Sequence, residues 1–326
     1  MALTRNWPAI LSWRLRLCFG ELWRVIKKRI AGRRYVPTTF ETMKPYFRDV
    51  AAGPFRIAPE RSDDLLALMG GTPWEIVLTG GPAQFTAYPD AGRIDVAPAG
   101  LASLWALTAV GYRYMELASR VAAGEGGKAH DQLIIHADPV FGQMVDYARR
   151  LFVADEPWPD GLPQPVECTA FDRTDGRINN LFLAATAWVV LHEIGHIAKL
   201  HTALLGRELR LGQEHEADKF AVCWALDHAA GEQREFRVLA ISVALAWLFL
   251  FEWAKRGGDG HPPAIVRFWQ AASYFQLDEQ SPALENAVYL LKGIFDPENP
   301  DMPSNMNPRE AFEWIDLRLE ELFPRG

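Results

Sequence analysis

One apolar segment of the sequence ends in two histidines and a glutamate, and this pattern constrains the fold more than any other feature. Residues 181–191 carry no charged side chain and lead directly into the motif His192-Glu193-x-x-His196. An α-helix turns by about 100° per residue, so residues four apart differ by only about 40° and share a face. Such polar side chains are costly to bury on an apolar helix without a partner. The segment therefore predicts a core helix that presents His192 and His196 to one metal ion.

A second predicted helix, rich in carboxylates at its start, supplies the remaining candidate ligand. Eighteen residues after His196 comes Glu214, and Asp218 lies four residues further on. A catalytic zinc ion takes three protein ligands and keeps a fourth position open. We therefore predict Zn²⁺ bound by the two histidines and Glu214, with Asp218 accepting a hydrogen bond from a ligand imidazole. Glu216 points about 160° away from Glu214 on a helix, and it is the second candidate for the carboxylate ligand.

Two further residues are candidates for catalysis rather than for metal binding. Glu193 lies beside the histidine face and is the predicted general base, placed to take a proton from an attacking water. A substrate oxygen that gains negative charge needs a further hydrogen-bond donor. His261, in the loop 257–263, is the candidate donor, and Tyr274 is the second. The competing interpretation is that His261 only holds a turn.

The periodicity of apolar residues indicates an α+β chain that is predominantly α-helical. Strand-like runs at 74–79, 84–88 and 93–96, separated by glycine- and proline-containing turns, predict a small antiparallel β-meander. A helical core follows the meander, and a long surface loop is predicted at 154–176. Asn307-Pro308-Arg309-Glu310 is a typical helix start. The predicted helices cover 101–122, 139–153 (with Asp138 as its cap), 178–203, 212–229, 234–255, 264–276, 282–294 and 308–322.

Charge is distributed unevenly along the chain. The net charge of −7 argues against a nucleic-acid partner. Residues 1–34 contain nine basic residues and one acid, which gives +8 and leaves −15 for the remaining 292 residues. We predict a basic, amphipathic N-terminal helix or arm over 1–34, followed by a single domain over 35–326 with its zinc core at about 178–277. The arm either packs on the domain with a solvated basic face or contacts a membrane surface or a partner.

Cysteine use and hydropathy indicate a cytoplasmic protein. The three cysteines, Cys18, Cys168 and Cys223, form no Cys-x-x-Cys pair, which argues for a reducing compartment. Cys223 lies in an apolar helical run and is expected to be a small buried residue. The longest apolar run, 238–251, is shorter than the roughly 20 residues that span a bilayer. The apolar stretch before Cys18 is broken by arginines and makes a poor secretory signal.

The histidine motif together with Glu214-x-x-x-Asp218 resembles the arrangement of gluzincin metallopeptidases. The residues around it, Gln213-Glu214-x-Glu216-Ala217-Asp218-x-Phe220-Ala221-x-x-Trp224, also resemble those of the Lit-like phage-exclusion peptidases, peptidase family U49. The resemblance covers about 178–225. It implies a zincin-like core and a zinc endopeptidase that cleaves an intracellular protein. It also implies elongation factor Tu as the type of target and abortive defence against phage as the role.

Two other families share parts of this pattern. The sequence His261-Pro262-Pro263 resembles that of membrane-embedded zinc peptidases, but their spanning helices are not predicted here. The segment 216–221 resembles the corresponding helix of regulator-cleaving peptidases of the ImmA/IrrE type, which remain an alternative although no helix-turn-helix is evident. A further alternative is a non-catalytic protein whose metal is structural or regulatory. A closed site with a fourth protein ligand would favour that alternative.

Overall fold

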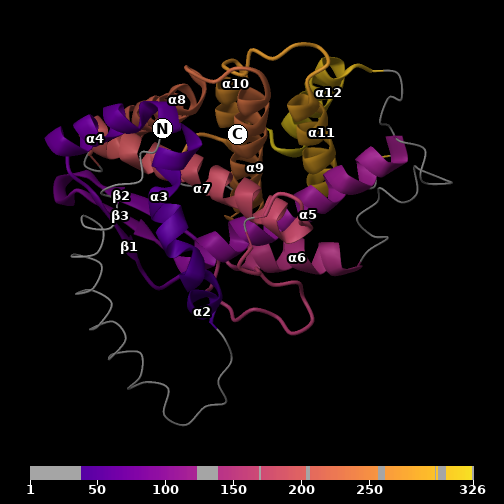
Figure 1. Cartoon of the computed structure of the whole chain (residues 1–326), viewed down its shortest axis with the longest axis horizontal. Coiled ribbons are helices and arrows are strands. Elements are labelled where there is room, and N and C mark those ends of the chain that lie inside the picture. Colours follow the sequence, from indigo (N-terminus) through magenta and orange to yellow (C-terminus); the bar gives the residue numbers. More distant parts are fainter. Residues whose placement is uncertain are drawn as a thin grey trace, which may run out of the picture. The chain divides into compact units, whose positions relative to one another are not determined.

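Helices make up most of the chain in the computed structural model, which describes residues 38–122, 139–168, 170–202, 206–255, 261–297, 299 and 306–324 (Figure 1). All of these residues belong to one compact unit, Thr38–Gly326. The helices are α2 (Thr39–Met43), α3 (Phe47–Ile57), α4 (Ser62–Gly71), α5 (Pro98–Ala122), α6 (Pro139–Arg150), α7 (Thr174–Ala198), α8 (Arg207–Leu226), α9 (Gly231–Lys255), α10 (Ala264–Ala272), α11 (Pro282–Phe295) and α12 (Pro308–Leu322).

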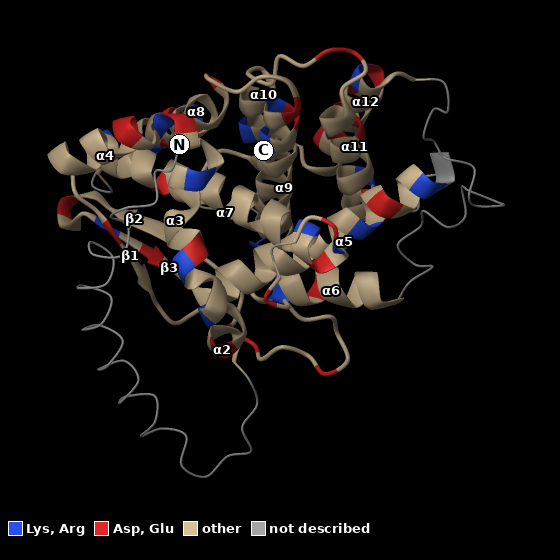
Figure 2. Cartoon of the chain, viewed as in Figure 1, with Lys and Arg blue, Asp and Glu red and all other residues tan. Residues whose placement is uncertain are grey.

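Helix α7 forms the centre of the core, as the uncharged run at 181–191 predicted. It packs against α3, α5, α8 and α9. Its large side chains, such as Phe182 and Trp188, are almost completely buried. Burying such a side chain stabilises the fold by about 1.5–3 kcal/mol. Figure 2 shows α7 without charge over most of its length, whereas basic and acidic residues alternate along the C-terminal half of α5.

Two helices are long and apolar enough to cross a membrane, namely α7 and α9. In both helices most of the apolar window is buried inside the fold, 78% in α7 and 67% in α9. The apolar surfaces are therefore covered by protein, as in the core helices of a soluble protein.

The β-sheet is mixed, and the predicted antiparallel meander was wrong in its topology. Strands β1 (Glu75–Leu78), β2 (Phe85–Tyr88) and β3 (Arg93–Val96) lie where the sequence predicted strands, but their order is β1-β3-β2. β2 and β3 form an antiparallel hairpin, while β1 pairs with β3 in parallel. β3 is the most buried of the three strands. This burial agrees with its position in the centre of the sheet, where β1 and β2 pair with its two edges.

The segment between β1 and β2 crosses the end of β3 instead of making a tight turn. The Thr79 amide donates to Val96 O, and the Ala97 amide donates to Gln84 O. Both ends of the glycine-containing link are thereby fixed at the same end of β3. β2 becomes an edge strand, and it lies beside α7.

Most of the predicted helices are present with shifted ends. The capping box at Asn307 and Glu310 is confirmed at the start of α12. Helices α2, α3 and α4 were not predicted. Cys223 is only partly buried. Asp138, Cys18 and the arm at 1–34 lie outside the described residues.

Gly195, inside the histidine motif, allows α8 to approach α7 closely. A Cβ atom at this position would lie 3.2 Å from Ala217 Cα and 3.2 Å from a ring carbon of Phe220. We expect Gly195→Ala to push the helices apart and to lower the free energy of unfolding by about 1–3 kcal/mol.

The matched control for this variant is Gly142→Ala in α6, where an added Cβ would meet nothing within 4 Å. There alanine should raise stability by about 0.5–1 kcal/mol, since it is the better helix former. Urea unfolding of both variants measures the difference. A Gly195→Ala protein as stable as the Gly142→Ala protein would contradict the close packing.

Candidate metal centre and active site

Three side chains from two helices converge at the C-terminal part of α7. His192 and His196 follow each other on one face of α7, and their Nε2 atoms lie 3.1 Å apart. Glu214, from α8, places Oε2 3.4 Å from His192 Nε2 and Oε1 3.6 Å from His196 Nε2. This group could hold a metal ion. The sequence-predicted ligands are therefore together, although they come from separate helices.

Asp218 lies behind the first of these histidines. Its Oδ1 is 2.9 Å from Nδ1 of His192, so it can fix the ring with Nε2 directed at the converging group. Arg267, from α10, donates to both oxygens of Asp218 at 2.7 and 2.6 Å. Both side chains are buried, with exposed fractions of 3% for Asp218 and 8% for Arg267. The carboxylate that was predicted to lie behind a ligand histidine is thus itself held by a buried arginine.

Burial and neighbouring charges shift the pKa values of the converging groups in different directions. Burial lowers the pKa of His192, but the Asp218 carboxylate outweighs it and raises the pKa to about 10. Burial and the charge on His192 lower the pKa of His196 to about 3. Burial raises the pKa of Glu214, but the imidazoles of His192 and His261 beside its carboxylate outweigh burial and lower the pKa. A cation bound here would displace the His192 proton, because ligand imidazoles must be neutral.

Glu193 lies next to the converging group and contacts the sheet. Its Oε2 accepts a hydrogen bond of 2.7 Å from the backbone amide of Ala87 in β2. The side chain is buried, and burial raises the pKa of its carboxyl group above the usual range. A raised pKa suits a carboxylate that must accept and return a proton near neutral pH.

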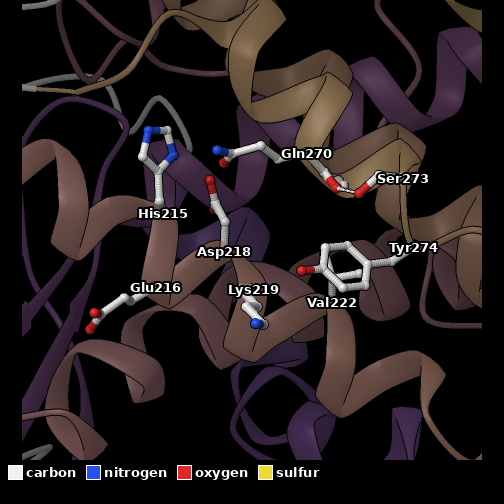
Figure 3. A pocket seen from close by; sticks show the side chains of 9 residues that line it. His215, Glu216, Asp218, Lys219, Val222, Gln270, Ser273 and Tyr274 are labelled. Carbon is white, nitrogen blue, oxygen red and sulfur yellow. Dashed lines mark hydrogen bonds between the residues drawn. The ribbon is translucent and has the colours of Figure 1, made fainter.

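His261 reaches the same place from the segment before α10. Its Nδ1 lies 3.1 Å from Oε2 of Glu214, and its side chain is 51% exposed. Tyr274, the second candidate for an oxyanion donor, lines a cavity between α8 and α10 together with Lys219 and Val222 (Figure 3). The three converging side chains do not line that cavity. The structure thus brings His261, and not Tyr274, to the candidate ligands.

Two residues at this site were not predicted from the sequence. Arg267 holds Asp218, and its only sequence signal is a single charge in the otherwise apolar segment 264–269. His201 lies just after α7, and its ring contacts His196. Glu216 does not join the candidate ligands; its carboxylate contacts His201 instead.

Comparison with known proteins places this chain among the peptidases. A family model described as Peptidase U49 matches residues 94–287, which is more than half of the chain. The chain therefore belongs to the Peptidase U49 family. A curated protein described as "Cell death peptidase", from Escherichia coli, is 22% identical over 250 residues, which cover 74% of this chain and 78% of that protein. No solved structure matches the chain significantly.

Proposed function

We propose that this peptidase is a zinc-dependent endopeptidase with His192, His196 and Glu214 as its metal ligands. The observation that carries the proposal is the convergence of two imidazole nitrogens and one carboxylate group. Atoms bound tetrahedrally at zinc's usual distances of about 2.0–2.1 Å are roughly 3.3 Å apart. The two Nε2 atoms are 3.1 Å apart, close to that value. The Glu214 carboxylate faces both of them, with Oε2 3.4 Å from His192 Nε2 and Oε1 3.6 Å from His196 Nε2. One ligand atom from each of the three residues lies within 4.8 Å of the other two. Two imidazoles and one carboxylate are also a common ligand set of catalytic zinc.

The remaining groups fit the hydrolysis of a peptide bond. When bound, zinc supplies a Lewis acid that polarises the scissile carbonyl and makes water a better nucleophile. Glu193 takes the proton from the attacking water and delivers it to the leaving amine. The Ala87 amide holds the Glu193 carboxylate in place until substrate arrives. His261 donates to the oxyanion, and Asp218 fixes the ring of His192.

Substrate binding is proposed to use β2. β2 pairs with β3 on one side and lies beside α7, so the main chain of an extended peptide can add along its outer edge. Such an addition would bring the scissile bond close to Glu193, which already contacts Ala87 in that strand. Affinity would then come from main-chain hydrogen bonds.

The proposed substrate is a cytoplasmic protein, and the proposed role is cell death in response to phage. The name of the Escherichia coli relative, "Cell death peptidase", supports the part in cell death. The response to phage rests on the resemblance to phage-exclusion peptidases. The resemblance to phage-exclusion peptidases adds a translation elongation factor as the type of target. An ImmA/IrrE-like activity would instead require a regulator as substrate.

Mass spectrometry of newly formed protein N-termini tests this function without assuming a substrate. Zinc-loaded protein and its Glu193→Gln variant are incubated with bacterial lysate, and separately with purified elongation factor Tu. New termini with the parent alone are the expected result, and cleavage of the purified factor would support the target. If only other proteins were cleaved, those proteins would replace elongation factor Tu as the proposed target. A zinc-loaded parent that forms no new termini would favour the non-catalytic metal protein.

A further inference from the structure

His201 is a buried histidine that has no role in the chemistry proposed above. Only 6% of the residue is exposed. Its Nδ1 lies 2.9 Å from Nδ1 of His196, and its Nε2 lies 3.1 Å from Oε2 of Glu216. The ring therefore connects the back of one candidate zinc ligand to a carboxylate on α8.

The way in which α7 ends explains why His201 reaches this position. Leu200 has φ +53°, and the Leu200 amide donates to Ile197 O while the His201 amide donates to His196 O. These two bonds form a Schellman motif, in which the chain reverses through a left-handed residue. The motif commonly brings the residue after the left-handed one against a residue in the last turn of the helix. Here that contact joins two imidazole rings.

The two contacts of His201 require one arrangement of protons. Nε2 of His196 points to His192 and Glu214, so in the ligand state the His196 proton lies on Nδ1. That proton can be donated only to an unprotonated Nδ1 of His201. The His201 proton then lies on Nε2, where the carboxylate of Glu216 accepts it. Both rings are neutral in this arrangement.

We infer that His201 is a positioning residue that holds His196 in the orientation and tautomer needed to bind the metal, with Glu216 orienting His201 in turn. The inference rests on the proposed zinc site. With His201 in this role, each histidine ligand has a partner at its Nδ1 atom, because Asp218, held by Arg267, contacts Nδ1 of His192. The two supports come from different elements: His192 contacts Asp218 of α8, which Arg267 of α10 holds, and His196 contacts His201 just after α7.

The outer end of this connection is exposed to solvent. The Glu216 side chain is 64% exposed, and Figure 3 shows its carboxylate pointing away from Asp218 and Lys219. Water can therefore replace the Glu216 carboxylate as the acceptor for His201. We expect the loss of Glu216 to have a smaller effect than the loss of His201, which water cannot easily replace at a buried site.

Zinc affinity, measured by competition with a chromophoric chelator, tests the role of His201. His201→Ala should weaken zinc binding about 10- to 100-fold, as is typical when the partner of a ligand histidine is removed. His201→Asn should recover most of that loss, because its amide oxygen takes the place of Nδ1 as an acceptor. Glu216→Gln should stay close to the parent, since it retains an acceptor for His201.

Three controls separate positioning from a general effect on folding. Unfolding of every variant in chelator reports stability without metal. Leu200→Gly relieves the left-handed strain at an exposed residue and should raise stability without weakening zinc binding. Glu208→Ala removes another exposed carboxylate of α8 and should leave zinc affinity unchanged. Cobalt-substituted His201→Ala should also show altered d–d absorption bands, which report ligand geometry.

Nitrogen-15 NMR of histidine rings in the zinc-loaded parent provides a test that needs no variant. The expected result is a His201 ring protonated at Nε2 and unprotonated at Nδ1. A parent that binds zinc with His201 protonated at Nδ1, or a folded His201→Ala protein with parental zinc affinity, would overturn the inference but leave the metal site standing. A folded parent that takes up no zinc would overturn the proposed function as well.

Discussion

We expect Glu193→Gln to lose peptidase activity while retaining zinc. Glutamine has the shape of glutamate and can still accept the hydrogen bond from the Ala87 amide, but it cannot take a proton from water. General base catalysis typically contributes about 10²- to 10⁴-fold, so turnover should fall by a factor in that range. Zinc content should not change, because Glu193 is not one of the proposed ligands. Cleavage rates on the substrate found by N-terminal mass spectrometry measure the loss.

The control for this variant is Glu232→Gln, which changes an exposed glutamate at the start of α9. It should retain both parental activity and parental zinc content. If Glu193→Gln cleaved at the parental rate with full zinc, the proposed role of Glu193 as the base would be wrong. If it lost zinc together with activity, Glu193 would have to support the metal site instead.

Arg267→Leu should cause the largest loss of stability among the variants at the site. It removes the guanidinium that donates two hydrogen bonds to the buried Asp218 carboxylate. Leaving a buried charge without its partner typically costs about 3–5 kcal/mol. Burial raises the pKa of Asp218, and the charge of Arg267 is the main influence that lowers it to about 2. The pKa should therefore rise in the variant, and zinc affinity should fall as the support of His192 weakens.

Urea unfolding in chelator, arranged as a double-mutant cycle, measures this effect. The double variant Arg267→Leu/Asp218→Asn should recover part of the lost stability, since it removes the buried charge as well. Arg113→Leu is the control, because Arg113 forms an exposed ion pair with Glu116 that is worth at most about 1 kcal/mol. The account would be contradicted if Arg267→Leu lowered the free energy of unfolding as little as Arg113→Leu does. It would also be contradicted if the double variant were no more stable than Arg267→Leu.

The local part of the site could be predicted from the sequence because helical periodicity determines it. His192, Glu193 and His196 lie within two turns of one helix, and Glu214 and Asp218 within two turns of the next. Their relative directions follow from the rotation per residue alone. Only the packing of the second helix on the first had to be assumed, and Gly195 makes that packing possible.

The parts that could not be predicted depend on contacts between distant segments or on how an element ends. Arg267 meets Asp218 across 49 residues of sequence, and no periodicity links the two. His201 reaches His196 only because α7 ends in a left-handed Leu200, where a glycine would have been the usual signal. The sheet order depends on the burial of β3, which a pattern of turns does not reveal. Helix α3 was not predicted because prolines and glycines interrupt the helical pattern in the segment 45–59.

The central claim is that the chain holds one zinc ion through His192, His196 and Glu214. Its most direct test is the zinc content of protein purified without chelator, measured by mass spectrometry of the metal, for the parent and for His196→Ala. We predict about one zinc per chain in the parent and little in the variant, with both proteins folded. A folded parent that contains no zinc and takes none up when it is added would contradict the claim.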